Sequence, residues 1–303
     1  MPPEGLADKV RALAREKGAL VLAHNYQLGE VQDVADFVGD SLELARKASQ
    51  VRADLILFCG VHFMAETAKI LNPDARVLEP DPNAGCPMAN MLNARQLRNL
   101  KGRHPLAVVV TYVNSSAEVK AETDVCCTSG NALKVVSGIP RDRDIIFVPD
   151  KSLGAYVSAK LDRPLIFWDG YCPTHHRITA EAVLQARREH PSAKVVVHPE
   201  CTPDVTALAD EVASTSGILR YASETSYAEY IIGTEIGMLH RLNKENPGKF
   251  FYPVTRFADC PNMKLNTLDK LLWSLEDGEF EVTVSEPTAS RAKKALDRML
   301  EFV

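Results

Sequence analysis

Gly85-Cys86-Pro87 is the stretch around which this 303-residue chain is organised, because it returns as Tyr171-Cys172-Pro173 and as Asp259-Cys260-Pro261. The second cysteine follows the first by 86 residues, and the third follows the second by 88. Self-similarity at a fixed period is the sequence signature of a repeated structural unit. The spacing therefore predicts one unit of roughly 87 residues that is used three times.

Two further features recur at nearly the same spacing. An apolar, strand-like run that ends in polar residues occurs at 21–26, 109–114 and 195–200. Single hydroxyl side chains recur in the same register, at Ser41, Ser129 and Thr215. Three independent features that share one period indicate a repeated unit rather than a coincidence of composition.

Short apolar runs alternate with amphipathic stretches in each unit, which predicts an α/β fold with short parallel sheets. Residues 33–48, for example, read as one helix. We expect the units at 1–88, 89–175 and 176–264, with the C-terminal helices of 265–303 packing near the first. Ligands of parallel sheets bind outside the carboxyl ends of the strands. The active site is therefore expected at the common interface of the three units.

Cys86, Cys172 and Cys260 would meet on the pseudo-threefold axis and form a trigonal metal site. A single cysteine before a proline is more often a small buried residue. Three in register favour a metal centre with one open coordination position, which is typical of catalytic sites. Zinc with a bound water and a [4Fe-4S] cluster with one open iron both fit this pattern. The other cysteines fall outside the register and are expected in the core or as lining: Cys59, Cys126, Cys127 and Cys201.

Polar residues at the predicted strand ends are candidates for proton transfer, namely Tyr26, Tyr112, His198 and Glu200. General acid–base catalysis needs such groups within hydrogen-bond reach of the reacting atoms. Taken singly, each has an ordinary explanation, since polar groups after strands are often solvated and buried tyrosines have satisfied hydroxyls. Their equivalent positions in the copies favour the catalytic interpretation.

The hydroxyls of Ser41, Ser129 and Thr215 fall near predicted helix N-termini. Plain N-capping would explain them, because Ser and Thr are common caps. A helix start also offers free N–H donors and a positive dipole end. The same residues could therefore hold the carboxylates or phosphate of an anionic substrate.

Composition excludes several classes of protein. The formal net charge is −5, which provides no basic footprint for nucleic acid. The N-terminal residues have scattered charges and no apolar segment of a signal peptide. The longest apolar stretch, 55–65, is far shorter than the ~20 residues that a membrane helix needs. We expect a cytoplasmic protein that binds no nucleic acid and no membrane.

The chain resembles the quinolinate synthases, iron–sulfur enzymes of NAD biosynthesis, over nearly its whole length. The resemblance is carried by ordered motifs: Ala23-His24-Asn25-Tyr26-Gln27, Gly39-Asp40-Ser41, Gly60-Val61-His62-Phe63-Met64-Ala65-Glu66, Thr111-Tyr112-Val113-Asn114, Thr128-Ser129, Asp169-Gly170-Tyr171-Cys172, His198-Pro199-Glu200-Cys201 and Ser214-Thr215-Ser216. It implies a triangular fold of three α/β/α domains. It also implies one oxygen-sensitive [4Fe-4S] cluster per chain, with ligands Cys86, Cys172 and Cys260 and one open iron.

The resemblance further implies that iminoaspartate (iminosuccinate) condenses with dihydroxyacetone phosphate, losing phosphate and water, to give quinolinate. The resemblance therefore also implies a functional link to the enzyme that supplies iminoaspartate. Tyr26 and Glu200 would move protons, with Tyr112 and His198 as further catalytic residues. By position, the residues expected to bind substrate are His24, Ser41, Tyr112, Val113, Asn114, Ser129, His175, His198, Pro199, Glu200 and Thr215.

One departure from the family pattern concerns the third cysteine. Many bacterial members have a C-x-x-C-x-x-C run there, whereas Cys260 stands alone. The alternative to the cluster enzyme is a zinc-dependent aldolase or hydrolase that uses the same three cysteines. A non-catalytic metal or redox-sensing module is the other alternative, but it would not need the polar residues at the strand and helix ends.

Overall fold

The repeated apolar runs form the central strands of three separate sheets in the computed structural model, which describes residues 5–302. The ends of the predicted ranges, residues 1–4 and 303, lie outside the described residues. In the first unit the elements are α1 (Leu6–Glu16), β1 (Ala19–His24), α2 (Gly29–Val34), β2 (Phe37–Gly39), α3 (Ser41–Gln50), β3 (Leu55–Cys59), α4 (His62–Leu71) and β4 (Arg76–Leu78).

The second and third units repeat this alternation. The second consists of η1 (Ala89–Met91), α5 (Ala94–Arg103), β5 (Val108–Tyr112), α6 (Ala117–Lys120), β6 (Val125–Cys127), α7 (Ala132–Ser137), β7 (Ile145–Val148), α8 (Lys151–Leu161) and β8 (Ile166–Phe167). The third consists of α9 (Pro173–His176), α10 (Ala180–Glu189), β9 (Lys194–Val197), α11 (Pro203–Thr206), β10 (Glu211–Val212), α12 (Thr215–Glu224), β11 (Glu229–Gly233), α13 (Met238–Glu245) and β12 (Phe250–Pro253). The chain closes with η2 (Pro261–Leu265), α14 (Leu268–Asp277) and α15 (Thr288–Glu301).

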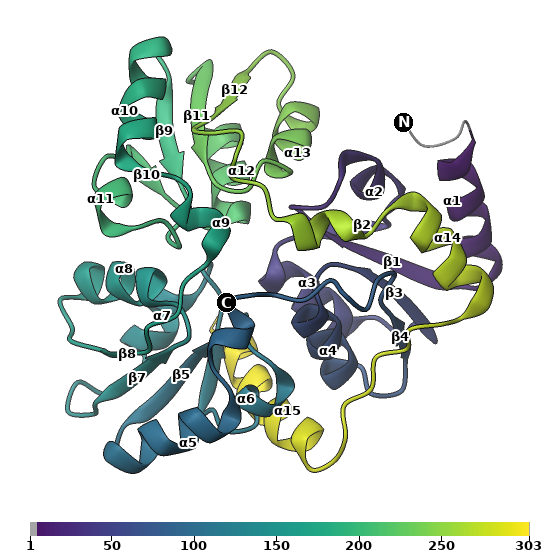
Figure 1. Cartoon of the computed structure of the whole chain (residues 1–303), viewed down its shortest axis with the longest axis horizontal. Helices are drawn as coiled ribbons and strands as arrows, with labels where there is room; N and C mark the ends of the chain where they lie inside the picture. The colour runs from purple at the N-terminus through teal and green to yellow at the C-terminus, as the bar shows by residue number, and fades with distance from the viewer. Residues whose placement is uncertain (1–4, 303) are drawn as a thin grey trace.

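All three sheets have four strands and the same topology. Their orders are β2-β1-β3-β4, β6-β5-β7-β8 and β10-β9-β11-β12. Every strand pair within them is parallel. Figure 1 shows the three units side by side around a common centre. The predicted α/β class with three short parallel sheets is confirmed.

A carboxylate anchors the first two strands of each sheet to one another. Two reciprocal hydrogen bonds join Asp36 to Val21. Asp36 N donates to Val21 O at 2.9 Å, and Val21 N donates to the side-chain oxygen Oδ2 of Asp36 at 2.8 Å. The same reciprocal pair joins Asp124 to Val109 and Asp210 to Val195. These aspartates are 88 and 86 residues apart, in the same register as the sequence features above.

Each sheet is buried on both faces, as parallel sheets generally are. In β1, Val21 and Ala23 pack into a cluster with residues of α1 and α14, whereas Leu22 faces a second cluster. That second cluster contains residues of all three units, among them Val110 and Val196. The units therefore share one large inner core, and each has a smaller outer core of its own.

The closing helices pack against different units. α14 lies against α1, whereas α15 lies against α4 of the first unit and against α6 and β6 of the second. The domain boundaries near residues 88, 175 and 264 stay a prediction. Within the described residues, none of the helices combines the length and the apolar character needed to cross a membrane.

The prediction of one helix over residues 33–48 is wrong. α2 ends at Val34, and residues 37–39 form the edge strand β2 before α3 begins at Ser41. Val34, Phe37 and Val38 have helical spacing, which explains the error. The strand forms because residues 37–39 pair with residues 22–24 of β1.

Candidate active site

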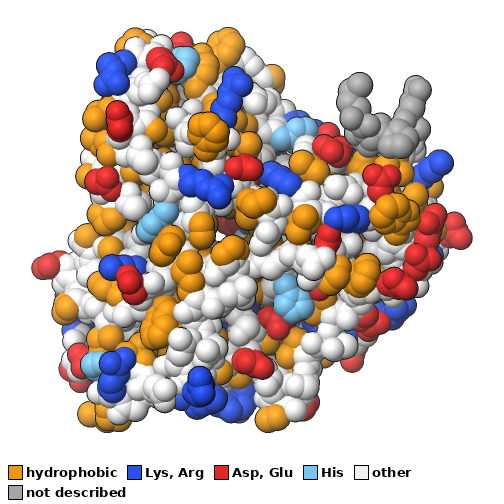
Figure 2. Space-filling view, in the orientation of Figure 1, with side chains coloured by type: hydrophobic (Ala, Val, Ile, Leu, Met, Phe, Trp, Pro, Cys, Tyr) orange, Lys and Arg blue, Asp and Glu red, His pale blue; other side chains and the backbone are white. Residues whose placement is uncertain are grey.

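The carboxyl ends of the central strands meet around one cavity at the junction of the three units. It opens on the face shown in Figure 2, where a small hollow lies near the centre. The sequence-predicted residues that line it are His24, Tyr26, Ser41, Cys86, Tyr112, Asn114, Ser129, Cys172, His175, His198, Glu200, Thr215 and Cys260. Val113 and Pro199 are buried but do not line it.

A repeated hydrogen bond places each cysteine loop beside the sheet of its unit. The donors and acceptors are His62 N to Ala84 O (2.8 Å), Lys151 N to Gly170 O (2.8 Å) and Ile236 N to Ala258 O (3.0 Å). Each acceptor lies two residues before Cys86, Cys172 or Cys260. The three loops are thus fixed in equivalent ways, and their cysteines reach the same cavity.

The repeated Cys-Pro step has a structural reason. Cys172 and Cys260 are the N-caps of α9 and η2, and the proline that follows each takes the first helical position, where it fits best. A backbone N–H three residues after each cysteine stabilises the thiolate form, namely that of Ala89, His175 or Met263. Helix N-termini favour thiolates for the same reason.

Burial has a larger effect on these thiols than the backbone donors. It raises the pKa of all three, that of Cys86 to about 12. The thiols of the metal-free protein are therefore protonated at neutral pH. A metal centre that binds here must displace their protons.

Buried carboxylates support two of the three cysteine loops. Cys260 N donates to Oε1 of Glu235 at 3.0 Å, and Lys264 Nζ lies 2.9 Å from the same oxygen. The equivalent residue of the second unit is Asp150, a buried carboxylate whose Oδ1 accepts from Leu153 N at 2.8 Å. The first unit has Val61 at this place. Its loop therefore lacks a carboxylate of this kind.

The donor set fits a centre held by three cysteines. One half-buried cysteine comes from each unit, and all three line the same cavity. Cys59, Cys126, Cys127 and Cys201 lie in the hydrophobic clusters and do not line it. The chemistry of three thiolates suits an iron–sulfur cluster, and it also suits zinc.

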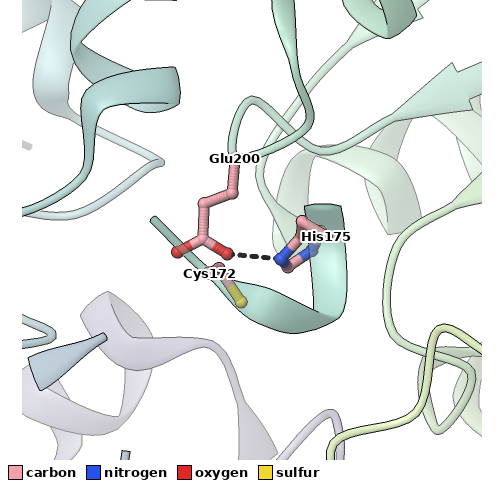
Figure 3. Close-up of side chains that lie close together, drawn as sticks. All are labelled: Cys172, His175 and Glu200. Atoms are coloured by element: carbon pink, nitrogen blue, oxygen red, sulfur yellow. Dashed lines mark ion pairs between the residues drawn. The ribbon is translucent and has the colours of Figure 1, made fainter. Parts of the chain in front are cut away.

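Glu200 and His175 form a buried ion pair beside Cys172 (Figure 3). Glu200 lies in the loop after β9 and His175 on α9, and Nδ1 of the histidine is 2.7 Å from Oε2 of the carboxylate. One donor atom from each of Cys172, His175 and Glu200 lies within 4.8 Å of the others, so a single metal ion could also use this set. Burial raises the pKa of Glu200, but His175, His198 and Tyr112 together lower it below its ordinary value.

His24 and His198 occupy equivalent strand ends and share one tautomer. Nδ1 of each accepts a backbone N–H from the residue two positions later, Tyr26 N at 3.1 Å and Glu200 N at 3.3 Å. Burial lowers the pKa of His24 to about 4 and that of His198 to about 3, against the opposing effect of nearby carboxylates. Both imidazoles are therefore neutral at pH 7, and Nε2 carries the proton. That proton of His198 faces Ser129 Oγ, at 3.1 Å.

Tyr26 and Tyr112 remain protonated over a wide pH range. Burial first, and the charge of Glu200 second, raise the pKa of both hydroxyls well above its ordinary value. The Tyr26 hydroxyl lies 2.6 Å from Oγ1 of Thr234, and Nε2 of His175 lies 2.9 Å from the same atom. Thr234 therefore connects Tyr26 to the ion pair of His175 and Glu200.

The three repeated hydroxyls do not cap helices. The backbone N–H groups that follow them in the chain are bound by the preceding residues instead: Asp40 accepts from Leu42 N and Glu43 N, Thr128 from Gly130 N, and Ser214 from Gly217 N. Ser41, Ser129 and Thr215 are thus left to line the cavity. Thr215 accepts from Asn25 Nδ2 at 3.1 Å, which links the first and third units.

Sequence reasoning missed Thr234, Glu235 and Asp150. Thr234 and Glu235 follow β11 directly. Their place at the carboxyl end of a central strand is a signal in the sequence that could have identified them as site residues. The three-copy comparison could not find them, because the equivalent positions are Val61, Asp150 and Glu235, which differ in chemistry. Their spacing of 89 and 85 residues also departs slightly from the common register.

Comparison with known proteins gives one consistent result. The family model described as "Quinolinate synthetase A protein" matches residues 8–301. A quinolinate synthase of Dehalococcoides mccartyi strain CBDB1 is 55% identical over 300 residues, which cover 99% of each chain. One of Thermodesulfovibrio yellowstonii is 51% identical over 98% of each chain. Quinolinate synthase 1 of Methanosarcina acetivorans is 51% identical over 99% of this chain and 98% of its own.

Proposed function

This chain belongs to the quinolinate synthase family and is an enzyme of that type, and from this premise we propose its substrates, its cofactor and the roles of its residues. The enzyme condenses iminoaspartate with dihydroxyacetone phosphate and releases phosphate and water as quinolinate forms. Its cofactor is a [4Fe-4S] cluster held by Cys86, Cys172 and Cys260. The observation that carries the proposal is the convergence of one thiol from each unit on the cavity that also holds Glu200 and the two neutral histidines.

When bound, such a cluster supplies an iron without a protein ligand, which can act as a Lewis acid toward a substrate oxygen or nitrogen. The substrates carry carboxylates and a phosphate, and the cavity offers neutral donors for them. His24 presents Nε2–H, and Ser41 and Thr215 present hydroxyls at the N-termini of α3 and α12. Hydroxyls and helix starts are well suited to bind anions.

We assign proton transfer to a carboxylate and two tyrosines, because their surroundings shift their pKa values in opposite directions. The lowered pKa of Glu200 keeps its carboxylate ionised at neutral pH, which is the form that a general base needs. Tyr26 and Tyr112 have raised pKa values and can donate protons or hydrogen bonds. Exclusion of water from the cavity when substrate is bound would protect a reactive imine from hydrolysis.

The test is anaerobic purification followed by measurement of iron, sulfide and quinolinate formation. We expect a brown protein with a broad absorption band, whereas a zinc enzyme would be colourless. Cys86→Ala, Cys172→Ala and Cys260→Ala should each lose the cluster and the activity. Cys59→Ala is the matched control, because Cys59 lies in the outer core of the first unit, and it should keep both. A full cluster in any of the first three variants would contradict the ligand assignment.

A further inference from the structure

Arg241 is a half-buried cation at the junction of the third and first units, and the proposed mechanism does not use it. It lies on α13 of the third unit, and one of its terminal nitrogens reaches two acceptors of the first unit. Nη1 donates to Oδ1 of Asn25 at 2.8 Å and to the carbonyl oxygen of Val38 at 2.9 Å. Nε donates to Oε1 of Glu245, one turn along the same helix, at 2.7 Å. The guanidinium group is therefore held in one orientation.

Asn25 connects this guanidinium group to the substrate-binding hydroxyl of Thr215. Its side chain is fully buried directly after β1. A guanidinium nitrogen can only donate, so it fixes the amide oxygen of Asn25 toward α13 and leaves the amide nitrogen on the other side. That nitrogen donates to Oγ1 of Thr215 at 3.1 Å. The hydrogen bonds thus run from the third unit into the first and back to the start of α12 in the third.

The direction of the last hydrogen bond decides what the Thr215 hydroxyl can do. The nitrogen of a side-chain amide only donates, so Oγ1 has to accept from it and keeps its own proton for another partner. Among the described residues, Oγ1 has no second hydrogen-bond partner, and Thr215 lines the cavity. The equivalent hydroxyl of Ser129 is in the same state, because it faces Nε2 of His198 at 3.1 Å. The Thr215 proton is therefore available to an anionic group of a bound substrate.

We propose that Arg241 is a positioning residue that, through the amide of Asn25, directs the hydroxyl proton of Thr215 toward a carboxylate or phosphate oxygen of the substrate. This inference rests on the proposed function, because that function makes both substrates anions. Without the guanidinium group the amide is free to turn over and to present its oxygen to Thr215. The hydroxyl would then donate to Asn25 instead of the substrate. The positions equivalent to Asn25 are Val113 and Pro199, whose side chains have no donor, so only this site is oriented in this way.

The experiment is a double-mutant cycle of Arg241→Met and Thr215→Val, in which KM and kcat are measured for each substrate in turn. We expect each single variant to raise KM for one substrate by about tenfold or more, the usual loss for a hydrogen bond to a charged group. The value of kcat should change much less, because the hydroxyl binds an anionic group that does not react. Adding Arg241→Met to Thr215→Val should leave KM unchanged, because no hydroxyl remains to be oriented. A raised KM for iminoaspartate assigns a carboxylate to Thr215, and a raised KM for dihydroxyacetone phosphate assigns the phosphate.

Lys244→Gln is the matched control, because Lys244 is a second cation of α13 that crosses the same junction. Its Nζ lies 2.6 Å from Oδ1 of Asp33, so its loss should leave KM at the wild-type value. Asn25→Asp tests the inference without removing the guanidinium group. It keeps an acceptor for Arg241 but presents a second acceptor to Thr215, so it should raise the same KM.

A wild-type KM in either Arg241→Met or Asn25→Asp would overturn the inference. An equal rise in KM on adding Arg241→Met with and without Thr215→Val would also overturn it, and would assign Arg241 a purely structural role at the junction. A wild-type enzyme that forms no quinolinate would instead contradict the proposed function.

Discussion

Substitution of Glu200 is the most direct test of the proposed chemistry. Its carboxylate is buried, ionised and paired with His175. Glu200→Gln removes the base while keeping the shape of the side chain. We expect turnover to fall by about 10²–10⁴-fold, the usual contribution of a general base, with cluster content unchanged. The measurement is the rate of quinolinate formation per cluster.

The matched control for Glu200 is Glu181→Gln, because Glu181 is an exposed glutamate on α10. It should have the wild-type rate. A Glu200→Gln enzyme that turns over at the rate of this control would remove Glu200 from the acid–base groups.

Thr234 tests whether the link between Tyr26 and His175 matters. Thr234→Val keeps the volume but removes the hydroxyl that contacts both. Loss of a buried hydrogen-bond partner costs about 1–3 kcal/mol, and about 1.4 kcal/mol corresponds to a tenfold change in rate. We expect kcat to fall by roughly tenfold or more, and Thr234→Ser to recover most of it. Equal rates for the valine and serine variants would show that the hydroxyl has no catalytic role.

Sequence reasoning succeeded for side chains that repeat and failed for those that do not. His24, Tyr112 and His198 occupy one position in three copies, so their place at the strand ends could be predicted. Thr234 has no chemical counterpart in the other units, and its contacts with Tyr26 and His175 join residues far apart in the chain. Local pattern carries no information about such contacts. The placement of Val113 and Pro199 away from the cavity also depends on how each loop turns after its strand.

At the scale of the elements, the repeated aspartates are expected to stabilise the sheets. Asp124→Ala leaves Val109 N, on the central strand β5, without its 2.8 Å acceptor. We expect the free energy of unfolding to fall by about 1–3 kcal/mol. Asp142→Ala is the control, because Asp142 is exposed. Equal denaturant midpoints for the two variants would contradict this role.

The elements that sequence reasoning predicted best are those whose periodicity agrees with their tertiary environment. β1 and β5 are apolar runs that are buried on both faces, and both were expected as strands. The edge strand β2 was missed because Phe37 and Val38 continue the helical spacing of α2. Pairing with β1 outweighs that local preference, as tertiary context often does for short strands.

At the scale of the whole molecule, α15 ties the first unit to the second. Leu296 is fully buried in the inner core that the units share. Leu296→Ala should lower the free energy of unfolding by about 2–5 kcal/mol, as large-to-small changes in a core do. Leu184→Ala is the matched control, since Leu184 is 44% exposed on α10, and it should change stability little. The measurement is chemical denaturation of both variants, and a difference below about 0.5 kcal/mol would contradict the role of α15.

The triangular arrangement could be predicted from the repeat and from the resemblance, but the place of α15 could not. Its amphipathic pattern indicates that one face is buried without indicating where. In the structure this face covers α4, α6 and β6 at the junction of the first and second units. The equivalent elements at the junction of the second and third units, α8, α11 and β10, line an open cleft instead. The threefold repeat is therefore imperfect at the first of these junctions, because α15 covers surfaces there whose equivalents line a cleft at the second.

The position of Cys260 along the chain has a consequence for the biogenesis of the enzyme. On the proposed ligand set, no single unit can bind the cofactor, because each contributes one sulfur. The third sulfur leaves the ribosome only after more than four fifths of the polypeptide has been synthesised. On this ligand set, binding of the cofactor by all three cysteines can therefore occur only late in synthesis or after it. Until then the nascent protein has to keep two unligated thiols from oxidation.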